Sequence, residues 1–332
     1  MVAVEGELSP IERLREAGRR HPALTALAVL GVIVVVLIAA KGLHDVAQRA
    51  VFGLSTGSIY ALGAVGLTLV YGILKLTNFA HGDYLTFGAY MAYVVNISWG
   101  LPLWLGIIFA MLMTAALSVF LEKIMWGPMR GRGAGILQLI LMSIGLALVI
   151  RYSIQYIWGT ELRSLDVNNT DTVEFFGLSI GVTQAIVIVI GFVTLLGTGL
   201  MLRYSLLGKQ MRALSDNLDL AETTGINTSR VILYTWLFAG AFAGLAGVLA
   251  GATTQLQPEM GFELLLPIFA AVVVGGIGNA FGALAGGILM GIVIEESTLF
   301  VDPGLKLAVG FLVLILVLIV RPQGIFGKAR TV

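Results

Sequence analysis

The run from Ala50 to Tyr93 most constrains the fold of this chain, because it is apolar, rich in glycine and long enough to cross a bilayer twice. One membrane-spanning helix needs about 20 apolar residues. Asn78, His81 and Asp83 interrupt the run, and polar groups at such a break are costly unless they face protein or water. The run therefore predicts two membrane helices joined by a polar break, and it points to a transport pathway.

The composition predicts an integral membrane protein. Of the 332 residues, 58% are hydrophobic and 12% charged, with a mean hydropathy of +0.96, whereas soluble domains carry about 25% charged residues. A net charge of +1 gives no bias toward nucleic acid. The absence of cysteine excludes disulfides, thiol nucleophiles and cysteine metal sites. The three histidines are too far apart for a local metal motif, so we predict no catalytic residue, metal site or bound cofactor.

Apolar runs of about 17–25 residues predict an all-α polytopic membrane protein with about ten transmembrane helices. The runs lie near 23–40, 51–72, 84–98, 102–121, 134–158, 179–202, 229–252, 264–277, 281–297 and 304–320. The third, eighth and ninth runs are short, so we expect partial or broken spans there. The first run also resembles a signal peptide, but it follows a 22-residue tail, which favours a retained helix.

The distribution of basic residues predicts the orientation. Arg13, Arg15, Arg19 and Arg20 precede the first run, and Lys123, Arg130 and Arg132 follow the fourth. Lys209 and Arg212 follow the sixth run, and Arg321, Lys328 and Arg330 follow the tenth. By the positive-inside rule these regions are cytoplasmic, and the acidic loop at 159–178 is then outside. Both termini are expected inside, with 1–22 as an N-terminal segment, 23–327 as the transmembrane domain and 328–332 as a tail.

The segment 205–226 breaks the apolar pattern in an organised way. Apolar residues recur at three- and four-residue spacing, which predicts one face of a helix: Met211, Leu214, Leu218 and Ala221. Asp216, Asp219 and Glu222 occupy other positions, and Gly225 can end the helix in a left-handed conformation. Periodicity alone leaves two interpretations open, a connecting helix on the membrane surface and a docking helix for a cytoplasmic partner.

Four motifs resemble the LivH-type permeases of branched-chain amino acid ABC importers. They are Asn78-Phe79-Ala80-His81-Gly82-Asp83 followed by Gly88-Ala89-Tyr90, Arg212-Ala213 with Asp216, Ala221 and Gly225-Ile226, Val274-Gly275-Gly276-Ile277-Gly278-Asn279, and Arg321-Pro322-Gln323-Gly324-Ile325-Phe326. They occur in the family's order from about residue 50 to 327. The sister LivM-type permease usually has Ser-Leu-Gly-His where this chain has Asn-Phe-Ala-His. Residues 1–22 have no counterpart in the pattern.

The resemblance implies a permease subunit of an importer for branched-chain or other neutral amino acids, and not an enzyme. It implies these partners: a second, LivM-type permease, two cytoplasmic ATPase subunits and an extracytoplasmic solute-binding protein, with the assembly in the plasma membrane, or the inner membrane if the cell has two. The sequence has no G-x-x-x-x-G-K-[ST] phosphate loop, so ATP and Mg are expected on partner subunits. The implied ATPase-coupling residues are Arg212, Ala213, Asp216, Ala221, Gly225 and Ile226.

Three alternatives remain beside this interpretation. Urea and short-amide permeases share the architecture. A passive solute channel would use Asn78 and Asn279 at the ends of two short helices, but it needs no coupling segment. An intramembrane enzyme using His81 and Asp83 ranks last, because no nucleophile motif accompanies them. No paired acidic and basic site for a zwitterion is evident in the sequence, so we expect the binding protein to make most of the selection.

The candidate residues of the translocation path are Asn78, His81, Asp83 and Asn279. The competing interpretation is structural: Asn78 or Asp83 caps a helix, and His81 hydrogen-bonds a carbonyl. Glycines at four-residue spacing predict close helix packing, namely Gly240, Gly244, Gly278, Gly282 and Gly286.

Three further charged residues fall in or near predicted spans. Arg151 lies toward the outer end of the fifth span, and we expect it to snorkel to the interface. A role of Arg151 toward the substrate carboxylate is the alternative. Glu295 and Glu296 near the outer end of the ninth span are expected to mark the membrane boundary, with contact to the binding protein as the alternative.

Overall fold

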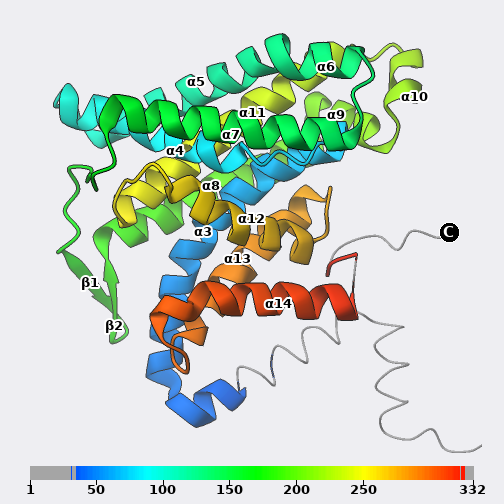
Figure 1. The fold of residues 1–332 in the computed structure, drawn as a ribbon. Helices are drawn as coiled ribbons and strands as arrows, with labels where there is room; N and C mark the ends of the chain where they lie inside the picture. The colour runs from blue at the N-terminus through cyan, green and yellow to red at the C-terminus, as the bar shows by residue number, and fades with distance from the viewer. Residues whose placement is uncertain (1–30, 32–34, 322, 326–332) are drawn as a thin grey trace, which may run out of the picture. The chain divides into compact units, whose positions relative to one another are not determined.

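The computed structural model describes residues 31, 35–321 and 323–325 (Figure 1). The segment 1–22, most of the predicted first helix at 23–40 and the tail 328–332 lie outside the described residues. The chain divides into two compact units, 1–48 and 49–332. In the first unit residues 35–41 are helical, and Gly42, with a φ of 88°, precedes the start of α3 (Leu43–Leu74).

The second unit consists mainly of helices. After α3 the elements are α4 (His81–Tyr93), η1 (Val94–Ser98), α5 (Leu103–Leu121), η2 (Glu122–Trp126), α6 (Gly127–Gly131), α7 (Ile136–Trp158), β1 (Thr172–Phe175), β2 (Leu178–Gly181), α8 (Val182–Tyr204), α9 (Leu206–Asp216), α10 (Leu218–Thr223), α11 (Thr228–Thr253), α12 (Met260–Gly275), α13 (Ala280–Ser297), η3 (Pro303–Leu305) and α14 (Lys306–Val320). Each predicted span from the second to the tenth overlaps one of these helices, although α3 begins at Leu43 and not at the predicted 51.

Seven helices of the described part are long and apolar enough to cross a membrane: α3, α5 with its extension to Gly131, α7, α8, α11, α13 and α14 with η3. The shorter α4 and α12 correspond to the third and eighth predicted spans, which were expected to be short. The ninth span was also expected to be short, but α13 reaches 18 residues. The all-α membrane fold class is therefore confirmed.

A β-hairpin in the acidic loop is the element that the apolar pattern did not predict. β1 pairs antiparallel with β2, with Phe175 opposite Leu178. Phe176 and Gly177 form the two-residue turn with φ values of 51° and 78°, as a type I′ turn requires. The predicted start of the sixth span at 179 is wrong by three residues, because β2 ends at Gly181 and α8 begins at Val182.

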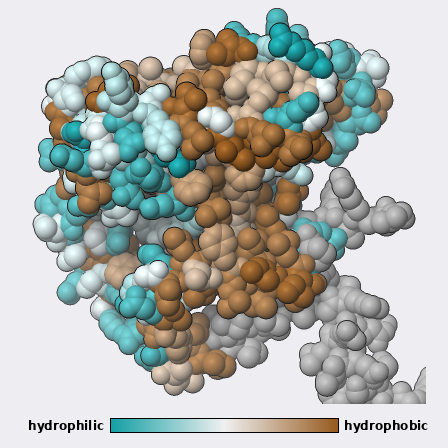
Figure 2. Space-filling model, in the orientation of Figure 1, coloured by the Kyte–Doolittle hydropathy of each residue, from teal (hydrophilic) through white to brown (hydrophobic). Residues whose placement is uncertain are grey.

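The core forms where helices lie close together. α11 packs against α4 and α5, and α12 packs against α13. Trp126 of η2 and Trp236 of α11 are both fully buried and stack with ring centroids 6.0 Å apart. In Figure 2 hydrophilic residues gather near the β1–β2 hairpin and again near α6 and α10, while apolar residues cover α14 between them. An apolar band between two polar ends is the surface that a bilayer requires.

Candidate functional site: two cavities and a cytoplasmic helix pair

The polar break after α3 is folded into the helix packing. Asn78 is buried, and its Oδ1 accepts a hydrogen bond from the Ala80 N–H at 3.1 Å in the turn that begins α4. His81, the first residue of α4, is buried too, and its Nε2 lies 2.9 Å from the Gly63 carbonyl oxygen of α3. These contacts support the structural interpretation of Asn78 and His81, in which the polar groups satisfy backbone groups.

Asp83 forms an ion pair with Arg151 of α7. The Arg151 Nε–Asp83 Oδ1 distance is 3.0 Å, and Nη2 donates to Oδ2 at 3.3 Å. The guanidinium also lies 4.6 Å from the centre of the Phe262 ring. The predicted snorkelling of Arg151 is therefore wrong, because a buried carboxylate on a neighbouring helix offers a partner. Asp83 does not cap α4, whose first residues receive no side-chain cap.

Four of the five predicted packing glycines lie where a side chain would not fit. A Cβ at Gly240 or Gly244 would overlap α5, and one at Gly282 or Gly286 would overlap the backbone of α12. Gly278 differs, because it has a φ of 84° in the turn before α13, and a Cβ at this position would have only the Gly72 Cα within 4 Å. Its role is thus the turn, since a left-handed conformation suits glycine.

A cavity of about 470 Å³ lies where α3 ends and α13 begins. We call it the inner cavity, because the orientation predicted from the basic residues places these helix ends on the cytoplasmic side. Asn279 lines it and caps α13, because its Oδ1 accepts from the N–H groups of Phe281 and Gly282 at 3.1 and 3.2 Å. Arg212, Ser215 and Asp216 of α9 line the same cavity. The other three path candidates, Asn78, His81 and Asp83, line neither this cavity nor the outer one.

The segment 205–226 forms two helices, so the prediction of a single helix is wrong. Asn217 ends α9 and caps α10, accepting from the Leu220 N–H at 2.9 Å. An extended Asn217, with φ of −158°, interrupts the helix because its side chain replaces the backbone acceptor. The predicted apolar face still points inward: Met211, Leu214 and Ala221 are buried.

Gly225 ends α10 as the sequence predicts. Its φ is 86°, the Ile226 N–H donates to the Ala221 carbonyl, and the Gly225 N–H donates to the Glu222 carbonyl. This pair of bonds is the Schellman arrangement. Ser215 Oγ donates to the Gly72 carbonyl at 3.0 Å, so α9 is fastened directly to the inner end of α3.

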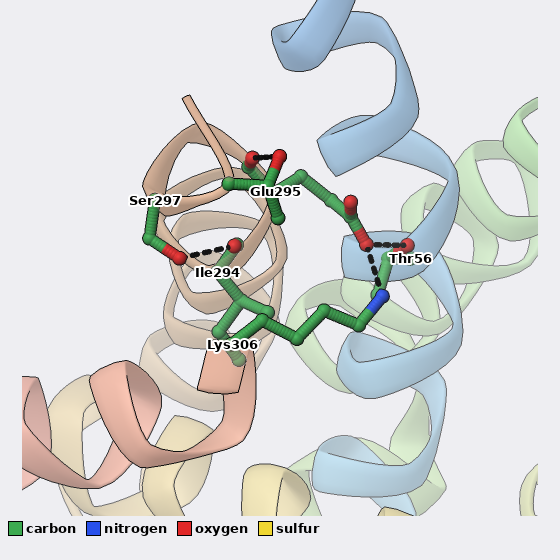
Figure 3. A network of polar contacts seen from close by, with 6 residues as sticks. Thr56, Ile294, Glu295, Ser297 and Lys306 are labelled. Carbon is green, nitrogen blue, oxygen red and sulfur yellow. Dashed lines mark hydrogen bonds and ion pairs between the residues drawn. The ribbon is translucent and has the colours of Figure 1, made fainter. Parts of the chain in front are cut away.

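An outer cavity of about 440 Å³ lies among the opposite helix ends. Thr56 and Tyr60 of α3, Thr253 of α11, Glu263 of α12 and Lys306 of α14 line it. Behind this wall, Glu295 of α13 accepts from Thr56 Oγ1 at 3.2 Å and from Lys306 Nζ at 3.1 Å (Figure 3).

Glu295 and Glu296 are both buried. They lie in the last turn of α13, and their placement at the membrane boundary stays a prediction. Glu295 and Lys306 form an ion pair between α13 and α14, a contact that the sequence did not indicate.

The two cavities agree with the predicted alternation of the spans. The outer cavity is lined by Thr56, Ile59 and Tyr60 near the start of the predicted second span, by the end of α11 and by the starts of α12 and α14. The inner cavity collects the ends of α3 and α8, the start of α13 and the helix α9. Helix ends that the sequence assigns to one side thus surround one cavity.

The outer loop is held across the helix ends by Arg163. Its N–H donates to the Leu256 carbonyl at 2.9 Å, and its Nη1 donates to the Tyr93 hydroxyl at 2.8 Å. Asn96 Oδ1 accepts from the Asp166 N–H at 2.7 Å. Within the described ranges no three His, Cys, Asp or Glu side chains are grouped to hold a metal ion.

A sequence profile of the branched-chain amino acid transport system permease component matches residues 49–318. The chain belongs to this permease family. It is 33% identical over 296 residues to LivH, the high-affinity branched-chain amino acid transport system permease protein of Salmonella typhimurium, covering 85% of this chain and 95% of LivH. The match to LivM of Escherichia coli is weaker, at 26% identity over 335 residues, covering 92% of this chain and 75% of LivM. This permease is thus LivH-type, as the Asn-Phe-Ala-His segment indicated.

A chain of PsaBC from Streptococcus pneumoniae in complex with Fab is 16% identical, with a TM-score of 0.47, and the match covers 87% of this permease and 97% of that chain.

Proposed function

We propose that this permease moves branched-chain or other neutral amino acids into the cell as one membrane subunit of an ATP-driven importer. The similarity to LivH, which covers 95% of LivH, supports the proposed substrate class. The companions are a LivM-type permease, two ATPase subunits that bind ATP and Mg, and an extracytoplasmic binding protein. The assembly resides in the plasma membrane, or the inner membrane of a cell with two.

The α9–α10 pair is the element that receives the ATPase. Its exposed charged residues are Arg212, Asp216, Asp219 and Glu222, of which Arg212 and Asp216 also border the inner cavity, and its apolar side is buried. A helix pair seated in an ATPase cleft transmits closure as a rigid-body movement, and the Ser215–Gly72 bond links it to α3. Ala213, Ala221 and Ile226 complete the coupling set by seating the two helices on the bundle.

The two cavities supply the ends of the path. The outer one receives solute from the binding protein, and the inner one, lined by Asn279, releases it. The polar break at Asn78, His81 and Asp83 holds α4 in place between them.

Purification in mild detergent tests the assembly. We expect ATPase subunits and a second permease to copurify, and the binding protein to stimulate ATP hydrolysis only with its solute. A scan across leucine, isoleucine, valine, alanine and urea then assigns that solute. Stimulation by urea alone would contradict the amino acid substrate class and favour a urea permease. Solute movement into vesicles that hold only this chain would contradict the importer and favour a passive channel.

A further inference from the structure

The outer cavity combines opposite charges with an apolar wall. Its volume of about 440 Å³ falls within the roughly 300–1,000 Å³ of small-molecule sites. Lys306 lies on one side of it, and Glu263 and Gln257 line it from α12 and the preceding loop. Ile59, Leu162 and Leu264 supply aliphatic surface.

Lys306 is held by Glu295, and its side chain stays partly exposed. Glu295 accepts one hydrogen bond from Nζ and is itself held by Thr56 Oγ1 (Figure 3). The Lys306 side chain remains 39% exposed, whereas that of Glu295 is 11% exposed. Because an ammonium carries three donors, donors remain for a ligand in the cavity.

Glu263 provides the opposite charge. Its Oε2 accepts from Gln257 Nε2 at 3.1 Å, and both residues line the cavity. A carboxylate has several acceptor sites, so Glu263 can also accept from a ligand ammonium. The aliphatic wall offers no group to compensate a second charge, and an uncompensated charge there is costly.

We propose that this cavity is a substrate site of the permease itself, which takes an aliphatic amino acid as its zwitterion. Lys306 binds the α-carboxylate, Glu263 binds the α-ammonium, and the side chain lies against Ile59, Leu162 and Leu264. Glu295 and Thr56 are positioning residues for Lys306. This inference rests on the proposed function and adds that the permease, and not only the binding protein, recognises both charges.

The test is cross-linking of photo-leucine to the assembled importer without binding protein, with the labelled peptides mapped by mass spectrometry. We expect labelling of the peptides that carry Ile59, Leu162 or Leu264. Unlabelled leucine should compete, whereas leucinamide and 4-methylpentanoate, which each lack one charge, should compete about tenfold to a hundredfold more weakly.

Each variant should remove the selection for one of the two charges of the ligand. Lys306→Gln should let leucinamide compete as well as leucine, and Glu263→Gln should do the same for 4-methylpentanoate. Lys306→Arg should retain the preference of the wild type. Glu259→Gln is the matched control for Glu263. It removes the same charge one helical turn away, at a residue that does not line the cavity. This variant should leave the order of the competitors unchanged.

Labelling elsewhere, or an unchanged order of competitors in both charge variants, would overturn the site. If Lys306→Gln fails to assemble, competition measured with Glu263→Gln and with the wild type still tests the site. Binding-protein-dependent leucine uptake by the wild type, measured in parallel, separates the two claims. Uptake without labelling in the cavity refutes this site alone, and absence of uptake of any amino acid refutes the proposed function.

Discussion

In the described part of this permease, two ion pairs join neighbouring helices at nearly the same distance but in different surroundings. Arg151 and Asp83 lie 3.0 Å apart, with side chains 13% and 0% exposed. Lys306 and Glu295 lie 3.1 Å apart, with side chains 39% and 11% exposed. We call the first the closed pair and the second the open pair.

The difference indicates what each pair does. In the closed pair both carboxylate oxygens bond the guanidinium and the Phe262 ring covers it. Little of either charge is available to a ligand, and the pair joins α4 to α7. The open pair borders a cavity and uses one donor of Lys306. The distance alone therefore does not separate a packing contact from a binding site, whereas access to the charge does.

The largest effect is expected from breaking the closed pair. Arg151→Met should destabilise the fold by about 3–5 kcal/mol, because Asp83 is left as a buried charge without its partner. The measurement is the unfolding midpoint of the purified protein in detergent. The double variant Asp83→Leu/Arg151→Met should recover most of the loss, and a single-variant loss below about 1 kcal/mol would contradict the packing role.

A smaller effect is expected from separating the helices beside the closed pair. A Cβ at Gly82 would overlap the Gly261 carbonyl of α12, so Gly82→Ala should cost about 1–3 kcal/mol. Gly145→Ala on α7 is the control, because no atom lies within 4 Å of its Cβ position. Equal unfolding midpoints for the two variants would show that close approach around the closed pair contributes nothing.

Gly225→Val extends the comparison to the inner face, where coupling and not solute binding is expected. A β-branched residue with φ of 86° should cost about 1–2 kcal/mol of local strain. We expect solute moved per ATP hydrolysed to fall, with the order of solutes unchanged. Gly225→Asn should behave nearly as the wild type, because asparagine tolerates this conformation. Normal ATP-driven uptake by the valine variant would count against the coupling role.

The smallest effect on stability is expected at the open pair. Lys306→Met should cost about 1 kcal/mol or less, because water reaches the pair from the cavity. The comparison fails if this variant unfolds as readily as Arg151→Met. A double-mutant cycle with Glu295→Gln, measured by the same unfolding midpoints, gives the coupling energy of the pair directly.

Much of the helical framework could be predicted from the apolar runs. The helices from α3 to α14 lie at the predicted spans, because one bilayer thickness sets the length of every run. Gly225 could be assigned as a helix end, since a left-handed conformation strongly favours glycine. The hairpin and the break at Asn217 were missed. A single Phe-Gly turn is a weak signal, and one asparagine does not disturb the apolar period.

The sequence by itself determined the family, the spans and the polar break, because hydropathy and motif spacing are local properties. Only the tertiary structure decided the partners of the charged residues. Asp83 and Arg151 are 68 positions apart, and Thr56 and Glu295 are 239 apart. A helical period states which face a residue occupies but not which helix lies against that face. Helix packing therefore buried the Arg151–Asp83 pair and placed the Lys306–Glu295 pair beside a cavity.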